Sequence, residues 1–107
     1  MTKNLDEEGL SSIVDNYQLF YVDLWGVIHN GISLHAKAIE ALKEITKKGK
    51  DYILLTNAPR PNYAVKSFLE KLGMEKEIRD HVFSSGEAAL VYLKTKLSNK
   101  SFFHIGA

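Results

Sequence analysis

Two short polar stretches carry the residue types that could do chemistry in this chain: Asp23 and the Thr56-Asn57 pair. Each directly follows an apolar run, LFYV before Asp23 and YILL before Thr56. An ionised carboxylate beside an apolar core is costly unless a cation or several hydrogen-bond donors lie next to it. A carboxylate can bind a cation, and a hydroxyl and an amide beside it can donate hydrogen bonds to an anion. The alternative role for Asp23 is that of a turn cap, the commoner use of a strand-terminal aspartate.

The segment that ends at Asp23 predicts a buried strand. Five of the seven residues from Tyr17 to Asp23 are apolar or aromatic, which is typical of a strand covered on both faces. Gly26 and the Asn30-Gly31 pair follow, and both mark tight turns in which positive φ is permitted. We therefore expect a carboxylate held at the open end of a buried strand.

Helices and strands are predicted to alternate along the rest of the chain, from apolar spacing and turn residues. Ser84 with Glu87 has the form of a capping box, and Leu90 and Leu93 are expected to face inward on the helix that it starts. Residues 1–16 form a leading helix or tail. The elements expected after the first strand are a helix from Ala36 to Lys48, a strand from Tyr52 to Leu55, a helix from Pro61 that closes at Gly73, an irregular or helical link from Met74 to Asp80, a strand from His81 to Phe83, a helix from Ser85 to Lys96 and a last strand from Phe102 to Ile105.

This alternation over residues 17–107 predicts one α/β domain with the order βαβαβαβ: a parallel sheet with right-handed crossovers and helices on both faces. In such sheets ligands bind beyond the carboxyl ends of the strands. That edge would bring together Asp23, Thr56-Asn57, Ser84-Ser85 and Gly106. The predicted site is therefore an anion site at this edge.

Composition excludes several classes of function. Fourteen basic and thirteen acidic side chains leave a net charge of +1. The chain therefore has no excess of positive charge of the kind that binds nucleic acid or an anionic membrane. The absence of cysteine excludes disulfides and thiolate metal sites, which fits a reducing compartment. The polar, acidic start MTKNLDEEG does not resemble a secretory signal, and the longest apolar stretch is too short for a membrane span. We expect a cytoplasmic protein.

Two motifs resemble a known family. The run Asp23-Leu24-Trp25-Gly26-Val27, together with LLTNAPRP at the end of the second strand, resembles the haloacid dehalogenase-like (HAD) superfamily. The nearest match is its subfamily IIA, the p-nitrophenylphosphatase-like branch. The resemblance extends to HVFSSGEAALVYL and the closing segment. It implies a Rossmann-type three-layer core and a phosphatase that acts on a small phosphorylated substrate.

The resemblance also implies roles for individual residues. Asp23 would be the nucleophile that forms an aspartyl-phosphate, and Mg²⁺ would be bound by its carboxylate and the backbone carbonyl of Trp25. Thr56 would hydrogen-bond the transferring phosphoryl group, and Asn57 would help to place the substrate. Arg60 could contact the phosphate with two hydrogen bonds, although a solvated loop arginine is the simpler reading.

The sequence departs from the family pattern DxDG, in which the second acid transfers protons, because Trp25 stands in its place. General acid–base catalysis is commonly worth about 10²- to 10⁴-fold. Either the leaving group needs little help, or His29 substitutes, or the protein binds phosphate without much turnover. Trp25 itself is expected to be a packing or substrate-facing aromatic, with burial and a bonded N–H as the default. An isolated loop histidine such as His29 is usually an ordinary surface residue.

The resemblance further implies parts that would lie beyond Ala107: a cap, a lysine and a second acidic motif. We therefore expect an N-terminal fragment, inactive alone, whose exposed first-strand edge promotes self-association. Two alternatives to a phosphatase remain: a non-catalytic phosphate-binding relative, favoured by Trp25, and a receiver-type phosphoacceptor module. The receiver pattern requires a further acidic pair that the sequence does not show, so it ranks last.

Overall fold

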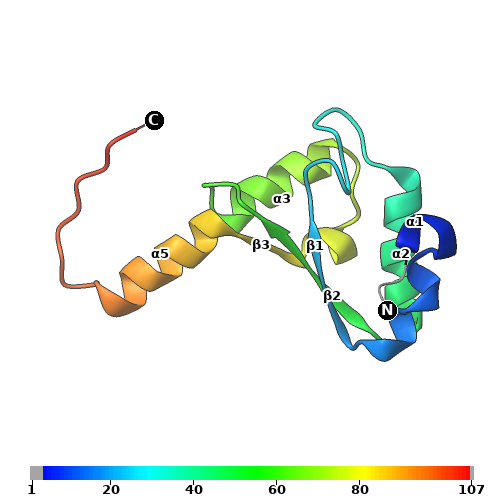
Figure 1. The fold of residues 1–107 in the computed structure, drawn as a ribbon. Coiled ribbons are helices and arrows are strands. Elements are labelled where there is room, and N and C mark those ends of the chain that lie inside the picture. Colours follow the sequence, from blue (N-terminus) through cyan, green and yellow to red (C-terminus); the bar gives the residue numbers. More distant parts are fainter. Residues whose placement is uncertain (1–3, 107) are drawn as a thin grey trace.

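The computed structural model describes residues 4–106, which form a parallel α/β fold (Figure 1). The three strands are β1 (Leu19–Asp23), β2 (Asp51–Thr56) and β3 (Val82–Ser84), hydrogen-bonded in the order β1-β2-β3. In the register, Asp23 lies opposite Leu55 and Thr56 lies opposite Ser84. All three strands therefore end at one edge of the sheet, as the sequence predicts.

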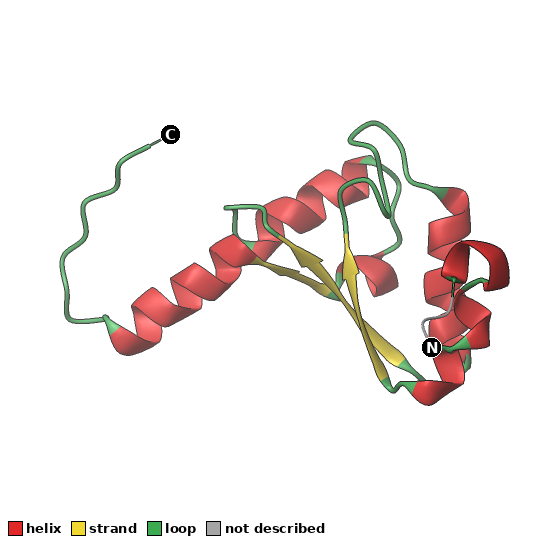
Figure 2. Cartoon of the chain, viewed as in Figure 1, coloured by secondary structure: helices red, strands yellow, loops and turns green. Residues whose placement is uncertain are grey.

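Helical segments connect the strands (Figure 2), and the polar residues Asp23, Thr56 and Ser84 are the last residues of β1, β2 and β3. α2 crosses from β1 to β2, while α3 and α4 cross from β2 to β3. The helical segments are α1 (Leu5–Glu8), the 3-10 turns η1 (Leu10–Ser12) and η2 (Val14–Asn16), α2 (Ala36–Lys47), α3 (Asn62–Lys71), α4 (Lys76–Arg79) and α5 (Ser85–Lys96). The predicted helices and the helical link are confirmed, and the leading helix is short because the chain turns at Gly9 with φ of 77°.

The hydrophobic core lies on one face of the sheet. Side chains alternate between the faces along a strand, and on β2 the residues Tyr52, Leu54 and Thr56 are buried while Leu55 is exposed. α2, α3 and α4 all contribute buried residues to the same cluster as Tyr52 and Leu54; these residues are Leu42, Ile45, Val65, Leu69 and Ile78. The hydrophobic core therefore lies between the covered face of the sheet and the helices α2, α3 and α4.

The expectation of a first strand buried on both faces is wrong. Along β1 the residues alternate between exposed and half-buried, and Tyr21 is 69% exposed. Among the described residues β1 is an edge strand, and no helix covers the face that carries Tyr21, Leu55 and Phe83. The α/β class with a parallel sheet is confirmed, and within residues 4–106 the helices with buried residues pack on a single face.

The predicted last strand, Phe102 to Ile105, is also wrong. After α5 the chain runs away from the sheet as an irregular segment (Figure 1), and Phe103 is 90% exposed. A strand needs a neighbouring strand for its backbone hydrogen bonds, and none of the described strands lies beside the segment from Phe102 to Ile105. α5 likewise has no buried residue and Leu90 is exposed, so the predicted inward stripe of this helix is not buried within residues 4–106.

Candidate functional site

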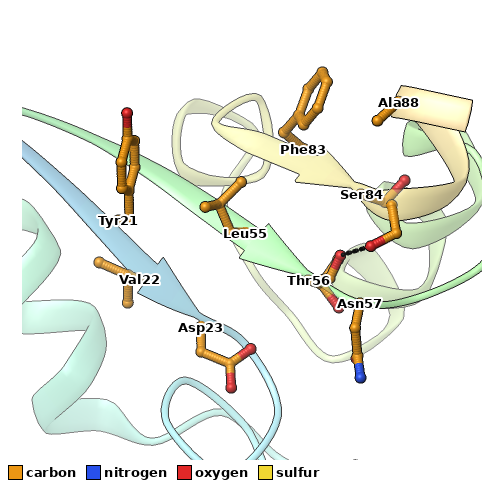
Figure 3. Close-up of a pocket in the computed structure, with 10 residues that line it drawn as sticks. Tyr21, Val22, Asp23, Leu55, Thr56, Asn57, Phe83, Ser84 and Ala88 are labelled. Atoms are coloured by element: carbon orange, nitrogen blue, oxygen red, sulfur yellow. Dashed lines mark hydrogen bonds between the residues drawn. The ribbon is translucent and has the colours of Figure 1, made fainter. Parts of the chain in front are cut away.

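The ends of the three strands surround a hollow of about 530 Å³. Asp23, Thr56 and Asn57 line it together with Ser84 and Ser85. The carboxylate of Asp23 and the amide of Asn57 extend beyond the strand ends, away from the rings of Tyr21 and Phe83 (Figure 3). All five of these residues were expected at this edge from the sequence, whereas Gly106, also expected there, lies in the irregular segment after α5 and does not line the hollow. We call this space the acid hollow.

Asp23 keeps much of its hydrogen-bonding capacity. Its side chain is exposed, and its Oδ1 accepts a hydrogen bond from the backbone N–H of Leu24 at 2.9 Å. This contact is the turn-capping role that the sequence left open. A carboxylate has about four lone-pair sites, so the cap leaves most of them for a cation or for attack on an electrophile. The capping role and the chemical role are compatible.

The turn after Asp23 presents a second oxygen. The carbonyl of Leu24 accepts hydrogen bonds from the N–H groups of Val27, Ile28 and His29, at 3.2, 2.9 and 3.3 Å. The neighbouring carbonyl of Trp25 accepts none from residues 4–106, because Gly26, with φ of 77°, turns the chain. An exposed carboxylate and a free carbonyl are oxygen ligands of the kind that Mg²⁺ prefers.

The described residues contain no group of three or more His, Cys, Asp or Glu that could hold a metal ion. Mg²⁺ is usually bound by one or two carboxylates, with substrate phosphate and water as the remaining ligands. Asp23 and the Trp25 carbonyl fit that pattern, and their donor set does not suit a metal that prefers nitrogen or sulfur. The site is therefore compatible with the expected Mg²⁺.

Thr56 is buried at the sheet edge, 8% exposed. Its Oγ1 accepts a hydrogen bond from the N–H of Ala58 at 3.2 Å, which leaves its own O–H free to donate. Its carbonyl accepts a hydrogen bond from Ser85 Oγ at 3.3 Å, drawn as the dashed line in Figure 3. Contacts on both its side chain and its carbonyl thus fix Thr56 in position.

The loop from Thr56 to Pro61 is clamped by the turn that starts α5, a feature that the sequence analysis missed. Ser84 Oγ donates to the carbonyl of Arg60 at 2.5 Å, and the N–H of Gly86 donates to the carbonyl of Ala58 at 3.1 Å. A Cβ on Gly86 would lie 2.5 Å from the Arg60 carbonyl oxygen. Only glycine allows this approach. The SSG sequence was the available signal, but its partner loop lies some 25 positions earlier in the chain.

The predicted capping box is built differently from expectation. Ser84 Oγ accepts from the N–H of Glu87 at 3.0 Å, as predicted. The reciprocal bond is replaced by Asn62, whose Oδ1 accepts from the N–H of Ser84 at 2.9 Å and whose own N–H donates to Glu87 Oε2 at 3.0 Å. Asn62 starts α3. The ends of β3, α3 and α5 are therefore tied together beside the site.

A second hollow of about 380 Å³ also reaches Thr56. Trp25, His29 and Phe68 line it, with Arg60. The rings of Trp25 and His29 lie 5.2 Å apart, and those of His29 and Phe68 lie 5.6 Å apart. The guanidinium of Arg60 pairs with no acid among residues 4–106 and is exposed, as a loop arginine would be. We call this space the aromatic hollow.

Two expectations about these residues are wrong. Trp25 is 61% exposed, and its ring lies over Gly31, where a Cβ would come within 2.4 Å of it. His29 is 2% exposed instead of lying at the surface. Its Nδ1 accepts from the N–H of Gly31 at 2.9 Å, so the proton of the neutral ring is on Nε2. Burial chiefly, then the charge of His35, lowers the pKa of His29, while Asp23 opposes that shift.

Comparison with known proteins gives these features a context. The family model for haloacid dehalogenase-like hydrolases matches residues 20–107. The chain belongs to this family. Phosphoglycolate phosphatase 2 of Arabidopsis thaliana is 34% identical over 93 residues, which make up 84% of this chain and 30% of that protein. The sequence-based assignment to the superfamily and its phosphatase branch IIA is confirmed.

Solved structures agree with the family assignment. A haloacid dehalogenase-like hydrolase from Brucella suis 1330 matches with a TM-score of 0.72 at 37% identity, over 78% of this chain and 31% of that chain. The 4-nitrophenylphosphatase from Thermotoga maritima matches with a TM-score of 0.62 at 26% identity, over 78% of this chain and 33% of that chain. The chain thus spans about a third of the length of these relatives. Within residues 4–106, no helix is both long enough and apolar enough to cross a bilayer.

Proposed function

We propose that this chain provides the nucleophile and the phosphate-binding residues of a Mg²⁺-dependent phosphomonoester hydrolase. The observation that carries the proposal is the convergence of Asp23, Thr56 and Asn57 on the acid hollow. The family relatives with phosphatase names support the same reaction class. The substrate class is a small phosphorylated molecule in the cytoplasm, and the roles of the individual residues remain predictions.

The proposed reaction has two steps. A carboxylate oxygen of Asp23 forms a bond to phosphorus while the ester P–O bond breaks and its electron pair leaves with the alcohol oxygen. Water then attacks the aspartyl-phosphate, releases inorganic phosphate and restores the carboxylate. Mg²⁺, held by Asp23 and the Trp25 carbonyl, would offset the repulsion between carboxylate and phosphate. The Thr56 hydroxyl donates to a phosphoryl oxygen, and Asn57 and Arg60 orient the substrate.

Proton transfer to the leaving group is the weak part of this site. His29 lies nearby, but its Nδ1 already accepts the Gly31 N–H and burial lowers its pKa, so the imidazolium form that a general acid needs is disfavoured. Trp25 has no acidic proton. This observation favours a second candidate: a relative that binds phosphate through Asp23 and Thr56 without turnover.

The two candidates are separated by an assay of the full-length protein with phosphomonoesters and Mg²⁺. Turnover that is lost on Mg²⁺ chelation and reduced at least about 10³-fold by Asp23→Asn supports the hydrolase. Binding of phosphate analogues without any turnover supports the non-catalytic relative.

Asp51→Asn is the matched control for that assay. Asp51 Oδ1 also accepts the N–H of the next residue, at 2.8 Å. It begins β2 at the opposite edge of the sheet, where it lies beside Leu19 in the register. We expect this variant to retain activity. Equal losses from Asp23→Asn and Asp51→Asn would contradict a nucleophilic role for Asp23.

We also propose that the 107-residue chain alone is inactive and self-associates through the β1 edge. The exposed Tyr21 and the side of β1 that pairs with no strand in residues 4–106 support this proposal, because unpaired edges template association. We expect light scattering to find species larger than a monomer, and Tyr21→Lys to reduce them. A monodisperse monomer at high concentration would contradict it.

A further inference from the structure

We propose that His29 is a positioning residue: its side chain fixes the orientation of the Trp25 carbonyl, the proposed backbone ligand of Mg²⁺. This inference rests on the proposed function, because it gives a role at the same site to a buried histidine that proton transfer leaves unused. His29 borders the aromatic hollow and is 2% exposed, although it lies in the loop between β1 and α2. A polar side chain that is buried needs hydrogen-bond partners, and the partner of His29 belongs to its own loop.

A single peptide group links the Trp25 carbonyl to His29. The carbonyl of Trp25 and the N–H of Gly26 belong to the same peptide group. That group is planar and trans, so the two bonds point in opposite directions. The Gly26 N–H donates to the carbonyl of His29 at 2.8 Å. The position of the His29 backbone therefore sets the direction of the Trp25 carbonyl.

The side chain of His29 holds that backbone from two directions. Within the loop, its Nδ1 accepts a hydrogen bond from the N–H of Gly31 at 2.9 Å. Towards the core, its ring packs edge-on against Phe68 of α3, with the ring centroids 5.6 Å apart and an angle of 68° between the ring planes. A shift of this side chain would carry the His29 carbonyl with it, and with that carbonyl the peptide group between Trp25 and Gly26.

The hydrogen bond is the directional part of this arrangement. Aromatic rings pack over a range of offsets and separations, whereas a hydrogen bond weakens steeply as its angle falls. Gly31 has φ of 88°, a conformation that glycine adopts without steric cost, and this turn presents its N–H to His29. We therefore expect the acceptor atom of His29, more than its ring, to control the Trp25 carbonyl.

A group that orients a metal ligand acts mainly on metal affinity. Such outer partners typically change metal affinity or activity by about 10- to 100-fold when they are removed. The carboxylate of Asp23 has its own hydrogen bond, from the N–H of Leu24, and does not depend on His29. Loss of the His29 acceptor should therefore raise the Mg²⁺ concentration that the enzyme requires, while enough Mg²⁺ should restore kcat.

The test compares His29→Phe with His29→Asn in the full-length protein. Phenylalanine keeps a ring beside Trp25 and Phe68 but cannot accept the Gly31 N–H, whereas asparagine removes the ring and keeps an acceptor oxygen in place of Nδ1. With p-nitrophenyl phosphate as the substrate, His29→Phe should raise the half-saturating Mg²⁺ concentration about tenfold and leave kcat at saturating Mg²⁺ within about twofold of the parent. In His29→Asn, the half-saturating concentration should stay within about threefold of the parent.

Stability separates a positioning role from a merely structural one. Asparagine leaves a cavity beside Phe68, so His29→Asn should lower the midpoint of urea unfolding more than His29→Phe does. The larger loss of stability and the larger Mg²⁺ requirement are therefore expected in different variants. An Mg²⁺ requirement that follows stability and is highest in His29→Asn would overturn the proposal. A parent-like Mg²⁺ requirement in His29→Phe would do the same.

A second readout needs neither Mg²⁺ nor substrate. In the metal-free full-length protein with isotope-labelled glycine, hydrogen exchange of the Gly26 and Gly31 amides reports the two hydrogen bonds directly. Both amides should exchange faster in His29→Phe than in the parent, whereas His29→Asn should keep them protected. Parent-like exchange of the Gly26 amide in His29→Phe would show that the side chain does not hold the Trp25 peptide, and it would overturn the proposal.

His35→Phe is the matched control. His35 is an exposed histidine of the same loop, and its side chain makes no capping hydrogen bond to α2. We expect this variant to keep the parent's Mg²⁺ requirement. An increase equal to that in His29→Phe would overturn the positioning role and leave the proposed phosphatase standing. A full-length parent whose activity does not depend on Mg²⁺ would overturn both.

Discussion

The two faces of the sheet are built in opposite ways. On one face, Leu54 is fully buried against helices; on the other, its neighbour Leu55 is 38% exposed beside Tyr21. The covered face fixes the position of Thr56 through packing and side-chain bonds. The open face ends at Asp23, which is held by its own turn. The proposed phosphate-binding half of the site is therefore preorganised by the fold, while Asp23, the proposed nucleophile, lies on an edge strand of the described sheet.

The largest expected effect comes from exchanging leucine for alanine on each face. Leu54→Ala leaves a cavity in the core and should lower the free energy of unfolding by about 2–5 kcal/mol. Leu55→Ala removes the same atoms from a partly hydrated position and should cost less than about 1 kcal/mol in the 107-residue chain. Denaturant unfolding of both variants checks the difference.

Measuring the free energy of unfolding of Leu54→Ala and Leu55→Ala in the full-length protein sharpens the comparison between the two faces. If further chain covers the open face, the cost of Leu55→Ala should rise toward that of Leu54→Ala. Equal costs already in the 107-residue chain would show that the two faces are equivalent, against the structure described above.

The next effect concerns the clamp on the loop from Thr56 to Pro61, which carries the proposed phosphate-binding residues. Ser84→Ala removes the hydrogen bond to the Arg60 carbonyl and the N-cap of α5. Because Ser84 is 1% exposed, the carbonyl it leaves behind is poorly hydrated, and the cost should be about 1–3 kcal/mol. KM for the phosphate ester should also rise, since the loop that carries Asn57 loosens.

Ser85→Ala is the control for the clamp. Ser85 is exposed and makes one long hydrogen bond, 3.3 Å, to the Thr56 carbonyl. We expect a change within about 0.5 kcal/mol. A larger loss from Ser85→Ala than from Ser84→Ala, measured by urea unfolding, would contradict the proposed clamp.

The parts of this structure that could be predicted from sequence are those with local causes. Turn residues and apolar periodicity define α2, α3 and the three strands, and the alternation of helix and strand brings Asp23 and Thr56 to one edge. Both inferences need only neighbouring residues along the chain and the handedness of crossovers.

The parts that could not be predicted depend on which elements lie side by side. The exposure of β1 follows from its place at the edge of the sheet, and the irregular course of Phe102 to Ile105 follows from the lack of an adjacent strand. The burial of His29 depends on Phe68, which is 39 positions away in sequence, and the need for glycine at position 86 depends on the backbone of Arg60. No local pattern records such long-range contacts.

The smallest expected effect is the pH dependence that His29 contributes on the covered side of the site. Burial, and secondarily His35, lowers its pKa in the folded state, so the unfolded chain binds the proton more readily. The contribution of neutral His29 to the free energy of unfolding is therefore fully present above the unfolded pKa of about 6.5, and it is lost as the pH falls below that value.

In His29→Gln, the free energy of unfolding should decline less between neutral and mildly acidic pH than in the parent. Urea unfolding at several pH values measures both slopes, and an unchanged slope in His29→Gln would show that this buried ring does not couple protonation to folding.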